Sequence, residues 1–211
     1  DPDATFMRMK DDYMKNGQLK PGYNLQIATE GQYVLAYQLF SNPTDTRTFI
    51  PFLDEIEKHY FKLPTYIVAD AGYGSEQNYE NVLTHRKREA LITYNTYVKE
   101  QKKRRKQQTW GLECFQYDEK QDAYICPNEK RLTYQYCTMR TDSSGFTREF
   151  HVYECEDCRG CPFRVNCTKA KEGRNRKLKV NKNFQHQKEY VREKLSEPKA
   201  GAIYRRRKIE V

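Results

Sequence analysis

The sequence offers no obvious membrane span, because no run approaches the roughly 18 consecutive apolar residues that a span requires. It also shows no secretory signal peptide, no glycine-rich phosphate loop and neither of the motifs G-x-S-x-G and H-E-x-x-H. Three of the four histidines, His59, His85 and His186, have no suitable partner at a useful spacing. We therefore expect a protein without membrane association, and we assign these histidines no role.

Acidic residues are in deficit, with 29 Asp and Glu against 38 Lys and Arg, which gives a net charge of +9. Hydrophobic residues make up only 37% of the chain, but 17 Tyr and 10 Phe provide large side chains to bury. Much of the positive charge lies in three runs: KEQKKRRKQQ (99–108), KAKEGRNRKLK (169–179) and YRRRK (204–208). Such clusters favour a polyanionic partner, most simply nucleic acid, over a set of solvated loops.

Cysteine, by contrast, is plentiful in this sequence, and its thiolate is a soft ligand for metal ions. Four of the seven cysteines lie in CEDCRGCPFRVNC (155–167), with the spacing C-x2-C-x2-C-x5-C, and Cys126 comes earlier in ICPNEK. Disulfides at two-residue spacing are geometrically awkward, so a reduced compartment and a metal site fit better. Tetrahedral Zn²⁺ needs four ligands, and the spacing alone does not choose four of these five cysteines. An iron–sulfur cluster and plain buried thiols remain alternatives.

The first hundred residues alternate between strand and helix patterns. Two β-rich runs in 23–41 flank Glu30-Gly31, a hairpin turn. A helical pattern follows Asn42-Pro43 with Asp45 or Thr46 as its cap, and Ser75 caps a second helix. Apolar strands are expected at 63–70 and 89–95. This order predicts an α/β fold in which a mixed sheet packs against helices.

The composition then changes along the chain. Residues 99–108 are basic and polar, short strand-like runs with all seven cysteines follow to about residue 168, and a helical pattern returns near the C-terminal end. We therefore divide the chain into a partial α/β core (1–98), a basic linker with a cysteine-rich β insertion (99–168) and a basic helical return to the core (169–211).

A single carboxylate marks the stretch TYIVADAGYGSEQNYENV (65–82), because Asp70 directly follows its apolar strand. Ligands of open α/β sheets gather at the carboxyl ends of the strands, where a carboxylate can hold a hard cation such as Mg²⁺. The alternative is that Asp70 merely caps the turn that follows, which is common for Asp. Spacing alone leaves both interpretations open.

Several segments together resemble the DDE-type transposases of bacterial insertion sequences: GYNLQIA, NPTDTRTFIPFLDEI, VADAGYGSEQNYE, the cysteine-laced insertion and YRRRKIEV. More narrowly, they resemble the transposase DDE domain group that carries a cysteine-rich insert. The resemblance implies a ribonuclease-H-like mixed sheet with helices, interrupted by a small β-rich insertion that contains cysteines. It also implies three acids that bind Mg²⁺ or Mn²⁺ and catalyse DNA strand cleavage and transfer.

The resemblance assigns roles to individual residues. Asp70 matches the second acid, the first is expected upstream of Asp1, and the third is either Glu210 or a residue just beyond Val211. A piece with one acid of three is expected to be inactive on its own. DNA contacts are expected from two groups of residues: Tyr204, Arg205 and Arg207, and Lys103, Arg104 and Arg105.

The resemblance also selects zinc ligands, by pairing a Cys-Pro turn with the later cysteine segment. The expected set is Cys126, Cys158, Cys161 and Cys167. Cys155 is the first substitute and His151 a weaker one, whereas Cys114 and Cys137 are interpreted as ordinary small hydrophobes.

The leading hypothesis is therefore a fragment of a DNA transposase that acts in the bacterial cytoplasm at the nucleoid. Its partners would be the ends of its element and the target DNA, and the intact protein is expected to form at least a dimer. Two alternatives remain: a non-catalytic zinc module that only binds nucleic acid, and an inactive transposase remnant.

Overall fold

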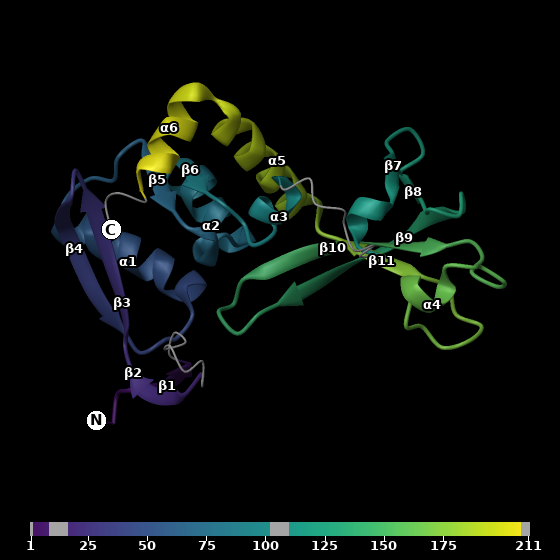
Figure 1. Ribbon diagram of the computed structural model, residues 1–211, viewed down its shortest axis with the longest axis horizontal. Coiled ribbons are helices and arrows are strands. Elements are labelled where there is room, and N and C mark those ends of the chain that lie inside the picture. Colours follow the sequence, from purple (N-terminus) through teal and green to yellow (C-terminus); the bar gives the residue numbers. More distant parts are fainter. Residues whose placement is uncertain (1, 9–16, 102–109, 208–211) are drawn as a thin grey trace. The chain divides into compact units, whose positions relative to one another are not determined.

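The computed structural model describes residues 2–8, 17–101 and 110–207, and the chain divides into two compact units (Figure 1). Unit 1 comprises Asp1–Gln101 and Gln187–Val211, and unit 2 comprises Lys102–His186. Helix α5 (Lys182–Ser196) begins in unit 2 and ends in unit 1. The expected mixed α/β class is confirmed, while the functional division at residues 98 and 168 remains a prediction.

Unit 1 begins with two antiparallel strand pairs. The first joins β1 (Thr5–Arg8) to β2 (Leu19–Gly22), and the second joins β3 (Asn24–Glu30) to β4 (Tyr33–Phe40). Gly31 and Gln32 form the tight turn of the second hairpin, with φ values of 56° and 71°. Positive φ at both central residues matches the twist of a two-residue hairpin turn.

The two faces of the β3–β4 hairpin differ in burial. Buried Gln26 and Ala36 lie on one face, and helix α1 (Asp45–His59) contacts both strands. Because side chains alternate along a strand, the opposite face carries a set of apolar side chains that are exposed: Leu25, Ile27, Leu35, Tyr37 and Leu39. Helix α1 buries its own apolar stripe at helical spacing: Phe49, Phe52, Leu53 and Ile56.

A parallel strand pair forms the centre of unit 1. Strand β5 (Tyr66–Ala69) pairs with β6 (Glu89–Ile92), and the connection runs through η1 (Ala71–Tyr73), α2 (Glu76–Glu80) and η2 (Asn81–His85). Residues 90–92 of β6 are fully buried, as expected for an interior strand. The fully buried Tyr79 donates a hydrogen bond of 2.9 Å to the carbonyl of Ile92, which fixes α2 to the end of β6.

Three further helices complete this unit: α3 (Tyr97–Gln101), the C-terminal part of α5, and α6 (Pro198–Arg206). Over the described ranges, the strands of unit 1 remain in three separate pairs and do not join into one sheet. The ribonuclease-H-like sheet therefore stays a prediction. In the same ranges, every helix is too short or too polar to span a membrane.

Unit 2 is a five-stranded antiparallel sheet in the order β11-β10-β9-β8-β7. Its strands are β7 (Gln116–Asp118), β8 (Ala123–Ile125), β9 (Arg131–Thr141), β10 (Thr147–Cys155) and β11 (Lys177–Val180). Two short helices belong to this unit: η3 (Leu112–Cys114) precedes β7, and α4 (Arg164–Cys167) lies between β10 and β11 in sequence. The core is small and aromatic, and it consists of Phe115, Tyr124, Leu132, Tyr153, Cys155, Cys158, Leu178 and Val180.

Asp122, in the β7–β8 turn, is the polar centre of this sheet. Its Oδ1 accepts hydrogen bonds from Tyr117 (2.7 Å), Tyr153 (2.8 Å) and Lys182 (3.0 Å). Partial burial acts to raise the pKa of Asp122, but these three donors outweigh it and lower the pKa to about 2. The Lys182 ammonium also lies over the rings of Tyr117 and Tyr153, so one carboxylate ties the turn to the start of α5.

Asp122→Asn is expected to remove an acid-dependent part of the stability. The carboxylate titrates near 3.8 in the unfolded chain and near 2 in the folded one, so its stabilisation is complete above about pH 4 and is lost as the pH falls towards 2. Urea unfolding of the original chain and the variant at pH 2, 4 and 7 measures this. The free energy of unfolding of the variant should be lower by about 1 kcal/mol at pH 7, and it should fall less steeply as the pH is lowered.

The control for this experiment is Asp118→Asn, because Asp118 also caps a turn in the same sheet through the N–H of Lys120 (3.0 Å). It should leave the acid dependence unchanged. An Asp122→Asn variant whose stability falls with acid as steeply as that of the original chain contradicts the assignment.

Candidate active site at the carboxyl ends of β5 and β6

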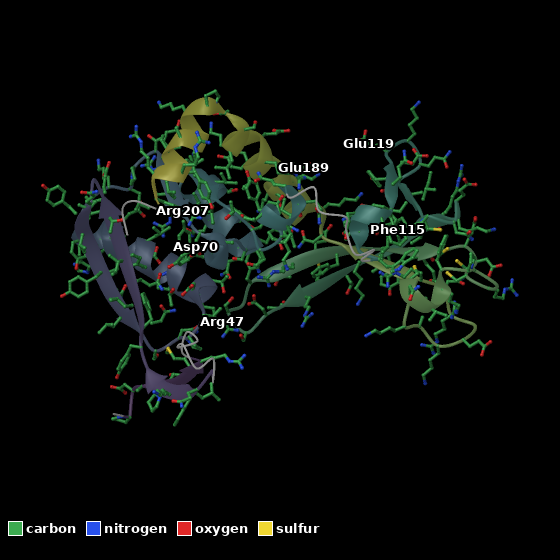
Figure 2. All side chains as sticks on the ribbon, in the orientation of Figure 1. Arg47, Asp70, Phe115, Glu119, Glu189 and Arg207 are labelled. Carbon is green, nitrogen blue, oxygen red and sulfur yellow. The ribbon has the colours of Figure 1, made fainter. Side chains whose placement is uncertain are left out.

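Asp70 lies directly after β5, and its side chain is exposed (Figure 2). Its Oδ1 accepts the N–H of Gly72 at 2.7 Å and so caps η1, as the turn interpretation predicts. Among the described residues, no donor contacts the second carboxylate oxygen, Oδ2. The cap therefore uses one oxygen and orients the carboxylate, while the other oxygen stays open to a ligand.

A second carboxylate, that of Asp45 at the start of α1, lies beside Asp70. A methyl group at Gly72 would lie 3.0 Å from Oδ2 of Asp45 and 3.0 Å from Oδ1 of Asp70, so the glycine separates the two acids. Oδ1 of Asp45 accepts hydrogen bonds from Asn24 (2.8 Å) and Gln26 (3.4 Å) on β3. The hairpin thus holds Asp45 in place next to the turn that carries Asp70.

Tyr73 links the same turn to the hairpin, because its hydroxyl donates to Oε1 of Gln26. Burial raises the pKa of Tyr73 to about 12, and the negative charges of Asp45 and Asp70 add to this effect. Tyr73 therefore stays neutral and acts as a donor at physiological pH. On the other side, the buried Asn78 donates to the carbonyl of Tyr73 at 2.8 Å.

The turn also packs closely against the chain that follows β6. A Cβ at Gly74 would lie 2.2 Å from the carbonyl oxygen of Thr93, which only glycine avoids. Because Ala69 pairs with Ile92, Asp70 and Thr93 are the next residues of their two strands. The carboxyl ends of β5 and β6 thus form one edge, which we call the β5–β6 edge.

Helix α6 reaches the β5–β6 edge through Tyr204. The Tyr204 hydroxyl lies 2.9 Å from Oγ1 of the buried Thr93, and the Arg207 guanidinium stacks 4.5 Å from the Tyr204 ring centroid. Nε of Arg207 is buried and, within the described ranges, has no hydrogen-bond partner. Arg205 is exposed in the last turn of the helix. Two arginines, Arg207 stacked on Tyr204 and the exposed Arg205, therefore belong to the same unit as Asp70.

In comparison with known proteins, residues 125–211 fit the family model described as transposase DDE domain. This stretch belongs to the transposase DDE domain family. No curated protein and no solved structure matches the chain. The match includes Tyr204, Arg207 and the cysteine cluster, whereas Asp70 precedes it.

Unit 2 gathers its clustered cysteines around one small cavity, whose cysteine lining consists of Cys126, Cys155, Cys158, Cys161 and Cys167. All five expected or substitute zinc-ligating cysteines are thus in one place, whereas His151 does not line the cavity. In the part of the chain that the structure describes, no three of these sulfurs lie within 4.8 Å of one another. The cysteines therefore surround one cavity, but their sulfur atoms are farther apart than in a tetrahedral metal site.

Local contacts distinguish two of these cysteines. Sγ of Cys158 accepts the backbone N–H of Arg176 at 3.3 Å. Sγ of Cys155 lies 3.7 Å from the carbonyl of Asp157, and burial raises the pKa of Cys155 to about 12. The Cys155 thiol thus donates where the Cys158 sulfur accepts, which favours Cys155 as the substitute rather than a ligand.

Only part of the basic surface is free to contact a polyanion. Arg176 donates to the carbonyl of Trp110 (3.2 Å), and Arg164 donates to the carbonyls of Lys171 (2.9 Å) and Arg174 (3.1 Å), so both guanidinium groups hold loops. The side chains of this region that are exposed are those of Lys169, Lys171, Arg174, Lys177 and Lys179, of which Lys177 forms an ion pair with Glu154 (3.1 Å). The predicted Glu210, Lys103, Arg104 and Arg105 lie outside the described residues.

Sequence reasoning missed the position of Asp45. Either Asp45 or Thr46 was expected to cap the helix, but Thr44 holds that position and Asp45 is the first helical residue. Its hydrogen-bond donors Asn24 and Gln26 precede it by 21 and 19 residues, so no local sequence pattern links them to Asp45. The only signal in the sequence was an acidic residue at the start of the helix that follows Asn42-Pro43.

The bond between Tyr204 and Thr93 gives a test of how α6 is held. Tyr204→Phe keeps the ring under Arg207 but removes the hydroxyl, so the free energy of unfolding should fall by about 1 kcal/mol. Thr93→Val should have a similar effect, and the double variant should lose little more than either single one. Urea unfolding measures all three variants.

Tyr60→Phe is the control, because Tyr60 is an exposed tyrosine of the same unit and its hydroxyl should contribute little. Fully additive losses at positions 93 and 204 contradict the proposed contact.

Proposed function

We propose that this chain works within a DNA transposase that cleaves and joins DNA strands by metal-dependent phosphoryl transfer. The observation that carries the proposal is the exposed Asp70 carboxylate at the β5–β6 edge, with one oxygen fixed by its turn and the other open. The family of residues 125–211 supports the same chemistry, because DDE transposases act on DNA with divalent metal.

The proposal includes a ribonuclease-H-like arrangement for unit 1. Two features support it: an antiparallel hairpin, β3–β4, and a parallel pair, β5–β6, whose connection passes through a helix. Asp70 then lies at the carboxyl end of a parallel strand, where α/β sheets hold their ligands.

The residues present fit a hard divalent cation. Asp70 would hold Mg²⁺ or Mn²⁺ through its open oxygen, and the neighbouring Asp45 adds negative charge beside it. Bound there, the metal would stabilise the attacking and leaving oxygens at a DNA phosphate. The remaining acids stay predictions: one upstream of residue 1, and either Glu210 or a residue beyond Val211.

Within this proposal the protein's own side chains have separate tasks. Tyr204 positions Arg207 by bonding to Thr93, and Arg207 and the exposed Arg205 contact DNA phosphate. Asp45 acts as a positioning residue, since it is anchored by the hairpin and flanks the Asp70 turn. Element ends and target DNA are the proposed partners, with at least a dimer holding two ends together.

We also propose that Cys126, Cys158, Cys161 and Cys167 hold a structural Zn²⁺. They line one cavity in a unit whose core is small, and a metal there would contribute folding free energy. An iron–sulfur cluster is the alternative with the same ligands.

A second candidate function is a zinc module that binds nucleic acid without catalysis. It is favoured by the exposed basic side chains next to the cysteine cavity in the same unit. In this case DNA binding with a steep salt dependence would need the cysteines and would not need Asp70.

Asp70→Asn, made in the full-length protein that carries this sequence, is expected to slow strand cleavage by at least about a hundredfold with Mg²⁺ and DNA that contains the element ends. DNA binding should persist, because Asp70 is not one of the basic groups. Asp70→Cys should be inactive with Mg²⁺ and partly recover with Mn²⁺, which accepts a thiolate more readily. Gel-resolved cleavage rates measure these effects.

The matched control is Asp118→Asn, since Asp118 caps a turn in the same way as Asp70 but lies in the other unit. It should cleave at the original rate, and Asp45→Asn should fall between the two. Cleavage by Asp70→Asn at the original rate overturns the transposase assignment and leaves the binding module.

The zinc proposal predicts which cysteine matters. Cys158→Ser should lose about one equivalent of tightly bound zinc, whereas Cys155→Ser should keep it, because the Cys158 sulfur accepts a backbone N–H and the Cys155 thiol donates to the Asp157 carbonyl. Metal analysis after dialysis measures both variants. A chain with no zinc or iron and seven freely titratable thiols overturns the proposal.

A further inference from the structure

Three metal-ligating side chains meet outside the cysteine cavity, on the hairpin formed by β9 and β10. They are Cys137, Glu149 and His151, and one ligand atom from each lies within 4.8 Å of the other two. In the described part of the chain, this is the one group of three or more Cys, His, Asp or Glu side chains that satisfies this distance.

The strand register explains why these residues meet. His151 lies directly opposite Cys137 across the two strands, and Glu149 precedes His151 by two residues, so all three side chains project from one face. A register irregularity lies between Val152 and Tyr153, one residue beyond His151. Such bulges commonly re-aim side chains near ligand sites.

The distances suit a small transition-metal ion. Tetrahedral Zn²⁺ has bonds of about 2.0–2.3 Å to thiolate, imidazole and carboxylate, which places its ligand atoms roughly 3.3–3.8 Å apart. Cys137 and Glu149 are exposed, so rotation of their side chains can close the remaining gap. A ligand set of one sulfur, one nitrogen and one oxygen matches zinc or cobalt better than magnesium.

The imidazole of His151 is incompletely satisfied. Its Nε2 lies 2.6 Å from Oε1 of Glu149, while Nδ1 is buried and has no hydrogen-bond partner within the described residues. Because Nε2 is the nitrogen that faces Glu149, a cation held by both side chains would bind Nε2 and offset the charge of the carboxylate.

From this geometry we propose that Cys137, Glu149 and His151 bind a Zn²⁺-type ion with three protein ligands and one open coordination position. The site is separate from the cavity lined by Cys126, Cys158, Cys161 and Cys167, and it does not depend on the proposed transposase activity. Sites with three protein ligands keep the fourth position for water or an external ligand.

The ion would join the two strands of the hairpin in the part that pairs with neither β8 nor β11. Strand β8 pairs with β9 only at Arg131–Thr133, and β11 pairs with β10 only at His151–Glu154. Residues 135–141 and 147–150 therefore form a two-stranded ribbon, which is marginally stable alone. The metal joins its two strands at the base of the ribbon.

Cobalt titration of the metal-free, reduced chain tests the proposal, because Co²⁺ replaces Zn²⁺ and reports its thiolate ligands by absorption. Cys137→Ser and His151→Gln should each lose about one equivalent of bound Co²⁺ and the band of a site with a single thiolate. Glu149→Gln, which keeps the side-chain shape, should weaken binding at this site about tenfold. Hydrogen exchange should show that metal protects residues 135–141 and 147–150.

Cys114→Ser is the matched control, because Cys114 is the other cysteine outside the cavity. This variant should bind cobalt as the original chain does. A Cys158→Ser/Cys167→Ser double variant removes the cavity ligands and should still bind Co²⁺ at Cys137. Circular dichroism confirms that the variants fold. Unchanged cobalt stoichiometry and spectrum in Cys137→Ser overturn the proposal, even if the cavity binds its own metal.

Discussion

The close contact between the turn after β5 and the chain after β6 organises the candidate site. Gly74 lies against the Thr93 carbonyl without room for a side chain, and Thr93 in turn meets Tyr204 of α6. Tyr79 adds a buried hydrogen bond to the carbonyl of Ile92. Because these contacts converge on two neighbouring residues, 92 and 93, the position of Asp70 and that of Arg207 are set by the same short stretch of backbone.

The two carboxylates at this edge have different supports. Asp70 is oriented by its own turn, whereas Asp45 is held by amide side chains from the hairpin. The neutral Tyr73, in the turn after Asp70, donates to Gln26 and so connects this turn to the amide side chains that hold Asp45. Two neighbouring carboxylates repel each other unless a cation or hydrogen-bond donors compensate, and among the residues that the structure describes, donors contact only Oδ1 of each. The arrangement is thus electrostatically suited to a divalent ion.

The sequence predicted the elements better than their assembly. Alternating apolar residues identified the hairpin, and the apolar strand before Asp70 identified β5, because both signals are local. The gathering of five cysteines could be predicted from spacing. The contact of Asp45 with Asn24, and the meeting of Cys137 with His151, depend on register and packing between distant segments, which no local pattern encodes.

The β3–β4 hairpin has a practical consequence for the isolated chain. Its face opposite Gln26 and Ala36 exposes Leu25, Ile27 and Tyr37 to solvent as a contiguous apolar surface. Exposed surfaces of this kind favour self-association when protein concentration rises. Light scattering of the purified chain should therefore grow with concentration, and dilute samples with moderate salt will suit biophysical work best.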